Sequence, residues 1–402
     1  MKWFLPILAL IATLHAESSL SDLPSKESDH LSKSKNLPDN TWLDLGAPKP
    51  DPKFGKARGH SWGARMPYAQ DLRGAFLFGE GVHGYVKPDG HYMDDLWLYD
   101  LNAHQWICLY PGADTKNLNL KINADGFESD DAGHAIPVAQ LVHSYENLTY
   151  DSDTHRFLFM PCPGDYWKKS LGPLRPLGLK QPTVTDASPW FYDAKAGHFD
   201  RSRTKSKTPP SGFGDVLMYV PSLKKTFFWH RDGVWFYDAA ANDWTEAKPE
   251  GKFPPFGIDP TAALDTRRNL IYIGGGSYPV VPAEQNALWI FDLNANSWRD
   301  PRPKNIPGSN SYNTNISVME YDTQNDKLLL FRHSSGDNNK HPRGVFIYDP
   351  EKNEWSTDPL PLPAWRGQCK NAFYAPDLNV YLFHSAGDSA DDGTIWAYRY
   401  HR

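Results

Sequence analysis

Histidines beside serine, glycine, tryptophan or arginine recur along the chain, and their side chains are the first candidates for chemistry. The candidates are His60, His83, His143, His230, His333 and His384. A neutral imidazole transfers protons near physiological pH and also binds metal ions. A single histidine is more often a buried structural residue, so a functional role depends on a fold that gathers several of them at one place.

Tyrosine, arginine and lysine side chains lie in the same segments as these histidines. The hydroxyl of Tyr145 or of Tyr166 could transfer a proton, and the guanidinium of Arg231 could bind a carboxylate. With His83 and His143 as partners, these five residues are the candidate catalytic set. The candidate substrate-binding residues are His60, His230, Tyr278, His333, His384 and Lys168.

A repeated motif indicates the elements that position these side chains. It runs aromatic, any residue, aromatic, Asp, five residues, aromatic, so the outer aromatics are always nine residues apart. Complete copies begin at Trp97, Trp190, Trp235, Trp289 and Phe346. Alternating apolar residues around a turn rich in Asp, Asn, Ala and Gly predict two antiparallel strands. Another hairpin signal precedes each copy, so each unit predicts a four-stranded sheet.

The sixth copy is divided between the two ends of the sequence. It begins at Trp396-Ala-Tyr398 without its closing aromatic, and the segment NTWLDL at 40–45 has the form of the missing half. An N-terminal strand would therefore complete the last sheet and leave no open edge in the ring. The prediction is an all-β, six-bladed propeller spanning 40–402.

In its paired aromatics and intervening turn, the chain resembles the Kelch-repeat family over about 41–402. The diglycine of that family is kept in Gly274-Gly275-Gly276 and half kept in Gly79-Glu80-Gly81. The resemblance implies a Kelch-type β-propeller with ligand sites on the face formed by the loop after each blade's second strand. The candidate histidines would then converge on one mouth of the channel, while the motif aromatics pack between blades.

The step from the first motif to the second is unusually long. It measures 93 residues, against 45 to 57 for the other steps, and it holds two extra segments at about 113–141 and 164–188. Neither segment contains the motif, so a seventh blade is not expected there. Long loops on a rigid scaffold often carry function.

Histidine, tyrosine and arginine on an exported propeller fit β-elimination on a polysaccharide that contains uronate. The secreted propeller lyases, including the ulvan lyases, are similar in fold and in these residue kinds. We therefore expect a polysaccharide lyase that acts on an acidic polysaccharide or oligosaccharide. Two alternatives stay open: a non-catalytic Kelch propeller that binds a glycan or a protein, and a sugar epimerase or mutarotase.

No metal or other cofactor is expected from the sequence. It contains neither H-E-x-x-H nor paired cysteines, and no phosphate-binding loop or nucleophile elbow. Tyr400-His401 has the adjacency found in galactose-oxidase-like copper enzymes, which share the Kelch scaffold, but it lies at the end of the chain. Cys108, Cys162 and Cys369 allow at most one disulfide.

The N-terminal residues predict export. Met1-Lys2, the apolar run of 12 residues at 3–14, and Ala16 form a signal peptide at 1–16, too short to cross a bilayer. The polar residues 17–39 predict a flexible leader. A net charge of −6 argues against nucleic-acid binding, and a mean hydropathy of −0.60 excludes a multi-span membrane protein. We expect a secreted or periplasmic monomer without a membrane span.

Overall fold

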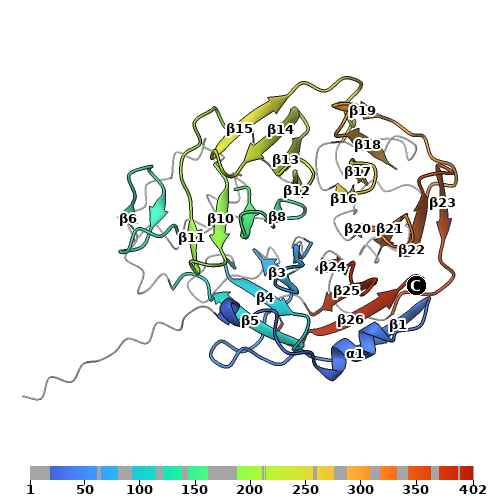
Figure 1. Ribbon diagram of the computed structural model, residues 1–402, viewed down its shortest axis with the longest axis horizontal. Coiled ribbons are helices and arrows are strands. Elements are labelled where there is room, and N and C mark those ends of the chain that lie inside the picture. Colours follow the sequence, from blue (N-terminus) through green and yellow to red (C-terminus); the bar gives the residue numbers. More distant parts are fainter. Residues whose placement is uncertain are drawn as a thin grey trace, which may run out of the picture.

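Six four-stranded antiparallel sheets surround a central channel, so the protein is an all-β, six-bladed propeller (Figure 1). The fold class and the number of blades predicted from the repeat are confirmed. The structure is a computed structural model. It describes residues 19–60, 65–79, 93–114, 121–137, 144–161, 188–210, 212, 214–256, 260–275, 288–307, 317–332, 343–363, 371–387 and 390–401.

Each blade is a meander whose first strand lies nearest the channel (Figure 1). Blade one contains β2 (Tyr68–Ala69), β3 (Gly74–Phe78), β4 (Leu96–Asp100) and β5 (Gln105–Tyr110). Blade two contains β8 (Leu148–Asp151), β9 (Arg156–Phe159), β10 (Trp190–Asp193) and β11 (His198–Asp200). Blade three contains β12 (Val216–Val220), β13 (Lys225–His230), β14 (Gly233–Asp238) and β15 (Asp243–Ala247).

The second half of the ring repeats this arrangement. Blade four contains β16 (Thr261–Asp265), β17 (Leu270–Gly274), β18 (Trp289–Asp292) and β19 (Ser297–Arg299). Blade five contains β20 (Ser317–Asp322), β21 (Lys327–Arg332), β22 (Gly344–Asp349) and β23 (Glu354–Thr357). Blade six contains β24 (Ala372–Ala375), β25 (Val380–Ser385), β26 (Thr394–Arg399) and β1 (Thr41–Asp44).

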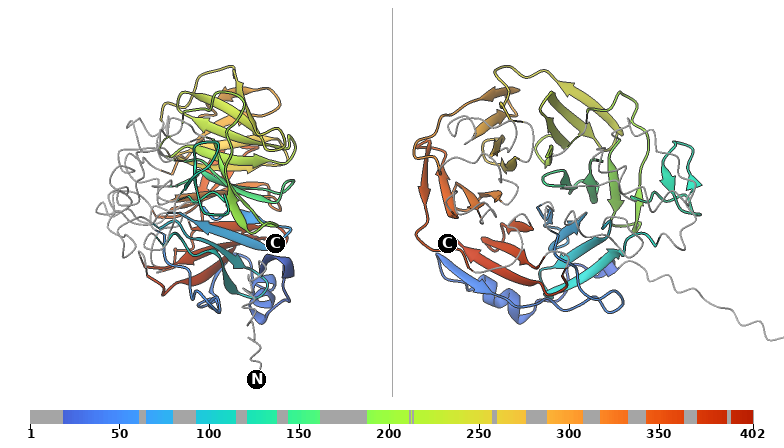
Figure 2. Two further views of the ribbon diagram at one scale, coloured as in Figure 1. Left: turned by 90° about the vertical axis from the view of Figure 1, so that its left-hand side faces the viewer. Right: turned by 180° about the vertical axis from the view of Figure 1, so that it is seen from behind.

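Three short features lie outside the blades. A small hairpin of β6 (Lys121–Ile122) and β7 (Glu128–Ser129) projects from the rim beside blade two (Figures 1 and 2). The 3-10 helix η1 (Ser19–Asp22) and helix α1 (Asp29–Lys35) precede β1. Neither described helix has the length and apolar character needed to cross a membrane.

The motif aspartate forms the turn between the third and fourth strands. In blade four, Asp292 Oδ1 accepts hydrogen bonds from the backbone N–H groups of Asn294 and Ala295, at 3.0 and 2.9 Å. Asn296 then takes a left-handed conformation with φ of +49°, which asparagine tolerates better than most residues. The same turn follows Asp349, with Asn353 at φ +52°. This closed turn fixes the nine-residue spacing of the motif.

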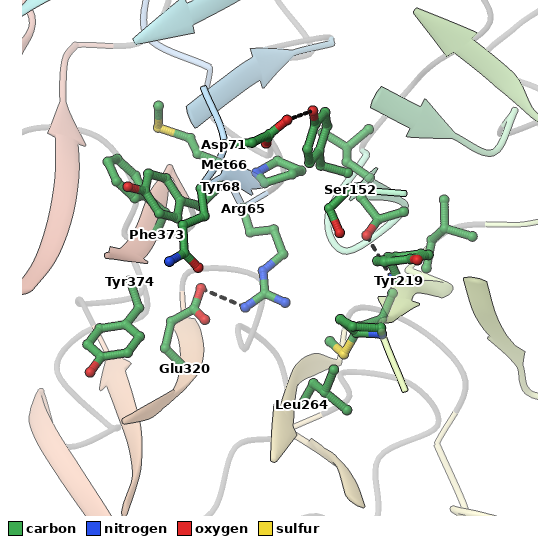
Figure 3. A pocket seen from close by; sticks show the side chains of 18 residues that line it. Arg65, Met66, Tyr68, Asp71, Ser152, Tyr219, Leu264, Glu320, Phe373 and Tyr374 are labelled. Atoms are coloured by element: carbon green, nitrogen blue, oxygen red, sulfur yellow. Dashed lines mark hydrogen bonds and ion pairs between the residues drawn. The ribbon is translucent and has the colours of Figure 1, made fainter. Parts of the chain in front are cut away.

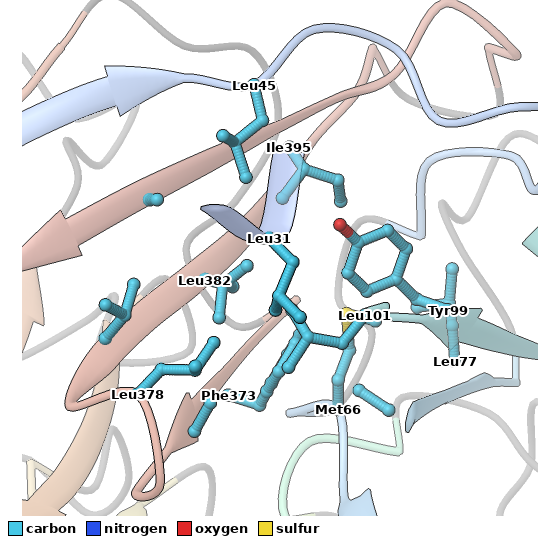
Figure 4. Packing of buried hydrophobic residues seen from close by; sticks show 14 of the residues in the cluster. Leu31, Leu45, Met66, Leu77, Tyr99, Leu101, Phe373, Leu378, Leu382 and Ile395 are labelled. Carbon is cyan, nitrogen blue, oxygen red and sulfur yellow. The ribbon is translucent and has the colours of Figure 1, made fainter. Parts of the chain in front are cut away.

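The hydrophobic core is divided into clusters between neighbouring blades. Among the described residues there are six such clusters, and each joins two adjacent blades around the ring. Between blades one and six, Leu77 and Tyr99 meet Phe373 and Leu382 (Figure 4). The motif aromatics belong to these clusters, so the prediction that they pack between blades is confirmed.

Blade six combines strands from distant parts of the chain. The strand β1 pairs with β26 in antiparallel register, from Thr41 opposite Arg399 to Asp44 opposite Trp396. The indole of Trp42 packs against Tyr398 and Phe383, with ring centroids 4.5 and 5.4 Å apart. This edge strand therefore brings both backbone hydrogen bonds and an aromatic side chain to the outer side of blade six.

The segment before β1 packs on the propeller, which differs from the flexible leader expected from its composition. Leu31 of helix α1 is buried in the cluster between blades one and six (Figure 4). The Ser28 N–H donates to the Asn102 carbonyl at 2.8 Å, and the His30 ring stacks on His104 at 4.1 Å. Arg399 Nη2 donates to the Ser34 carbonyl at 2.9 Å. Leucine burial and side-chain contacts hold this polar segment in place.

A largely buried guanidinium belongs to a network of side chains from four blades at the channel. Arg65, just before β2, lies 2.6 Å from Glu320 Oε1 of blade five and 3.5 Å from Glu146 Oε2 of blade two. The hydroxyl of Thr261 in blade four donates to Glu146 Oε1 at 3.2 Å. Burial raises the pKa of Glu320, and the charge of Arg65 opposes that shift. The one cation between the two carboxylates therefore offsets part of the cost of burying charge on Glu320.

Replacing Arg65 by methionine should lower the free energy of unfolding by about 3–5 kcal/mol, because it leaves the buried Glu146 and the largely buried Glu320 without their cation. Lowering the pH from neutral should restore part of this loss, since protonation removes the buried charges. Chemical denaturation at several pH values measures both effects. The control is Arg302→Met, whose side chain is 84% exposed beside Asp300 and should cost at most about 1 kcal/mol. Equal losses in the two variants would contradict the prediction.

The contact between helix α1 and blade one should weaken in acid. Burial, followed by the charge of His30, lowers the pKa of His104 to about 4. A histidine whose pKa is lowered by folding makes its full contribution to stability at pH values above its pKa in the unfolded chain, about 6.5. This contribution is lost as the pH falls toward 4.

His104→Asn should therefore reduce the fall in melting temperature between neutral and acidic pH. The substitution suits the site, because His104 has φ of +53° and the equivalent turn residues in other blades are Asn242, Asn296 and Asn353. The Tyr99 hydroxyl, now 2.8 Å from His104 Nδ1, could bond to the new amide as Tyr237 does to Asn242. An unchanged acid sensitivity would show that His104 is not responsible.

Candidate functional site

The sequence-predicted site residues divide into two groups. Five of them, His60, Tyr145, His230, Arg231 and His384, belong to the described part of the chain. The other six lie outside the described residues: His83, His143, Tyr166, Lys168, Tyr278 and His333. The geometry of the site is therefore built from the first group and from the residues that contact it.

His60 and His384 are buried side chains, which differs from the exposed substrate contacts expected of them. The His384 ring packs on Trp106 of blade one, with ring centroids 5.0 Å apart. Burial, followed by the neighbouring His60, lowers the pKa of His384 to about 3. A Cβ at Gly393 would come within 2.2 Å of His384 Nε2. The imidazole is thus enclosed at the junction of blades six and one and neutral at physiological pH.

His230 forms a pair with a buried aspartate in blade three. His230 ends β13, and Asp215 immediately precedes the neighbouring strand β12. His230 Nδ1 lies 3.2 Å from Asp215 Oδ1, and the two side chains are 10% and 1% exposed. The backbone N–H of Gly212 donates to Asp215 Oδ2 at 2.7 Å. The carboxyl of Asp215 therefore orients the imidazole through Nδ1, and Nε2 lies on the opposite side of the ring.

Burial shifts the two groups toward their uncharged forms. It raises the pKa of Asp215 well above its ordinary value, although the Gly212 N–H favours the carboxylate. It lowers the pKa of His230 to about 4. Two titratable groups in hydrogen-bond contact can exchange a proton. With a proton on the carboxyl and another on Nε2, the ring can donate from Nε2, and loss of the carboxyl proton would let Nε2 act as a base. Such a pair can act as a general acid or a general base.

Two exposed charges follow His230 in the tight turn to β14. Arg231 and Asp232 have side chains that are 60% and 63% exposed. Asp232 Oδ2 lies 3.4 Å from His230 Nε2, and its Oδ1 lies 3.8 Å from Arg231 Nε. The guanidinium of Arg231 is available to a ligand carboxylate beside the imidazole. The structure thus links the side chains of His230 and Arg231, which are neighbours in the sequence, through their contacts with Asp232.

Tyr145 lies at the same end of the propeller, in neighbouring blade two. Its carbonyl accepts a hydrogen bond from the Arg65 N–H at 3.2 Å, and the next residue, Glu146, forms a parallel bridge to Val216. Asn147 Nδ2 donates to the Gly212 carbonyl at 3.2 Å. These contacts link Tyr145 to the Asp215–His230 pair. Tyr145 itself is buried, which differs from the open position expected of a catalytic base.

Sequence reasoning missed Asp215, Arg65 and Glu146. One signal was present: Glu146 precedes Tyr150 by four residues, and Asp215 precedes Tyr219 by the same interval. Both tyrosines occupy innermost strands, so an acidic residue recurs at one structural position in two adjacent blades. The partners of these carboxylates come from other blades, and no spacing in the sequence reveals them.

A cavity of about 690 Å³ occupies the opposite end of the channel (Figure 3). Its wall includes Tyr150 and Tyr219, at the far ends of the strands that Glu146 and Asp215 precede. The ion pair of Arg65 and Glu320 is part of its lining (Figure 3). Arg65 thus lies between this cavity and the end of the channel that carries the Asp215–His230 pair.

The described side chains include no group of three or more His, Cys, Asp or Glu residues suited to a metal ion. Of the cysteines, Cys108 lies in β5, whereas Cys162 and Cys369 are outside the described residues. Around His230, the described residues offer proton transfer by the Asp215–His230 pair and a positive charge on Arg231 for an anionic ligand.

Comparison with known proteins leaves the function to be argued from this geometry. The chain matches no protein-family model, and no curated protein matches it.

Proposed function

We propose that this chain is a secreted, Kelch-type propeller that cleaves an acidic polysaccharide by β-elimination at a uronate residue. The observation that carries the proposal is the buried Asp215–His230 pair with an exposed arginine directly beside it. The five motif copies and the pairing of β1 with β26 support the Kelch-type assignment and the completion of the last blade by an N-terminal strand. Residues 1–16 support export.

The proposed reaction needs a base, an acid and a carboxylate-binding group. The base removes the proton on C5 of the uronate, the C4–O4 bond breaks, and a C4=C5 double bond forms. Arg231 would bind the carboxylate and stabilise the negative charge that develops on it. His230 Nε2 would accept the C5 proton, with Asp215 holding Nδ1, and the proton would return to the leaving oxygen. The steps are assigned to side chains of this chain alone.

This assignment differs from the roles expected from the sequence. His230 was expected to bind substrate, whereas its hydrogen bond to a buried carboxyl favours a role in proton transfer. Arg231 keeps its expected role. Tyr145 contacts the same network through its backbone, so its role in the proposal is to position Glu146 and blade three.

Incubation with a panel of uronate polysaccharides should produce unsaturated products, measured by their ultraviolet absorbance. His230→Gln should lower kcat/KM by about 10²–10⁴-fold, the usual contribution of a general acid–base group. Arg231→Gln should lower it through weaker transition-state binding, with an unchanged melting temperature because the side chain is 60% exposed. Arg302→Gln is the exposed control. Binding of the polysaccharides without any absorbance rise would overturn the lyase and favour the binding propeller.

The two aspartates that contact His230 should differ in their effect on activity. Asp215→Asn should lower kcat by about 10²–10⁴-fold, because the amide fixes the ring less well and cannot take part in the titration of the pair. Asp232→Asn should have a much smaller effect on kcat, since that carboxylate is 63% exposed although it lies 3.4 Å from Nε2. The acid limb of the pH–kcat/KM profile should lie above the ordinary aspartate pKa, because burial raises the pKa of Asp215. In Asp215→Asn this limb should move. Similar losses in both variants, with the acid limb unmoved, would refute this role.

A further inference from the structure

A second cavity lies between blades four and five, away from the Asp215–His230 pair. Its volume is about 270 Å³, and its wall comes from β17, β18, β19 and β22 and from the turn after β22. Leu270 in this wall begins the second strand of its blade, whereas His230 ends the second strand of blade three. The two sites therefore lie toward opposite ends of the sheets.

Some polar groups of this cavity are already bound to other residues. Arg268 makes two hydrogen bonds of 2.6 Å to Asp326 and one of 2.9 Å to Asp265. Asn353 Oδ1 accepts from the Tyr348 hydroxyl at 2.9 Å, and its Nδ2 donates to the Pro301 carbonyl at 2.6 Å. These bonds fix the wall between the two blades.

Two hydrogen-bond donors in the same wall have no bond to another described side chain. Within the described residues, the guanidinium of Arg299 has no ion-pair partner, and the hydroxyl of Tyr272 makes no hydrogen bond. Tyr272 is 1% exposed, and burial raises its pKa, so it stays protonated and able to donate. A ligand oxyanion would satisfy both the hydroxyl and the exposed cation.

The remaining wall suits the apolar face of a small ring. Leu270, Ile290, Pro301 and Pro350 supply hydrocarbon surface around the two donors. The volume is below the roughly 300–1,000 Å³ typical of pockets for drug-sized ligands. One ring with one carboxylate matches this combination of volume, apolar wall and two donors.

We propose that the cavity between blades four and five binds a single carboxylate-bearing sugar unit. Arg299 pairs with the carboxylate, Tyr272 donates a hydrogen bond to it, and the ring lies against the prolines. Only the choice of a sugar acid as the ligand rests on the proposed function, since the anion site itself does not require the elimination reaction. The site would hold an acidic chain at a distance from the acid–base pair.

A ligand-observed NMR titration of the full chain with the monosaccharide glucuronate tests this site. Glucuronate should bind and glucose should not. Arg299→Gln and Tyr272→Phe should each weaken binding about tenfold, the usual effect of losing a hydrogen bond to a charged group. Arg302→Gln is the matched control, because this neighbouring arginine is exposed and does not line the cavity. Melting temperatures verify that each variant is folded.

The outcomes separate this proposal from the proposed function. Loss of glucuronate binding in Arg231→Gln, but not in Arg299→Gln, would overturn the second site. Equal binding of glucose and glucuronate, or no binding, would also overturn it. Glucuronate binding that depends on Arg299 would support it even if no polysaccharide is cleaved.

Discussion

The ion pairs of Arg65 are the interaction on which the centre of the propeller depends. This one cation contacts carboxylates from blades two and five, and Glu146 is also bound by Thr261 of blade four. Glu146 in turn bridges to Val216, the residue after Asp215. The position of the acid–base pair is therefore coupled to the ion pairs at the channel.

The architecture could be predicted because the repeat has a local physical cause. An aspartate such as Asp292 closes its turn with bonds to residues two and three positions later, and Asn296 then accepts a left-handed conformation. Such contacts within a few residues leave a fixed spacing in the sequence. The N-terminal segment has no comparable signal: its composition is polar, and contacts with distant parts of the propeller, such as those of Leu31 and His30, keep it in place.

The candidate site was less accessible to prediction because its contacts cross between blades. The sequence identified His230 and Arg231, yet Asp215 became visible as a partner only when β12 and β13 were paired. The sequence did not distinguish His384, enclosed against Trp106, from the more accessible His230. Arg299 and Tyr272 had no signal either, since the cavity they line exists only between two assembled blades.

The pairing of β1 with β26 also affects the order in which the molecule can assemble. Thr41 and Arg399 are partners although almost the whole length of the ring separates them along the chain. During synthesis, the earliest strand must wait for the last one, because its hydrogen-bonding edge has no partner until residues near 399 have emerged. Contacts between such distant segments slow folding. Until residues near 399 have emerged, a nascent chain therefore carries five complete sheets at most, with Trp42 still exposed to water and to chaperones.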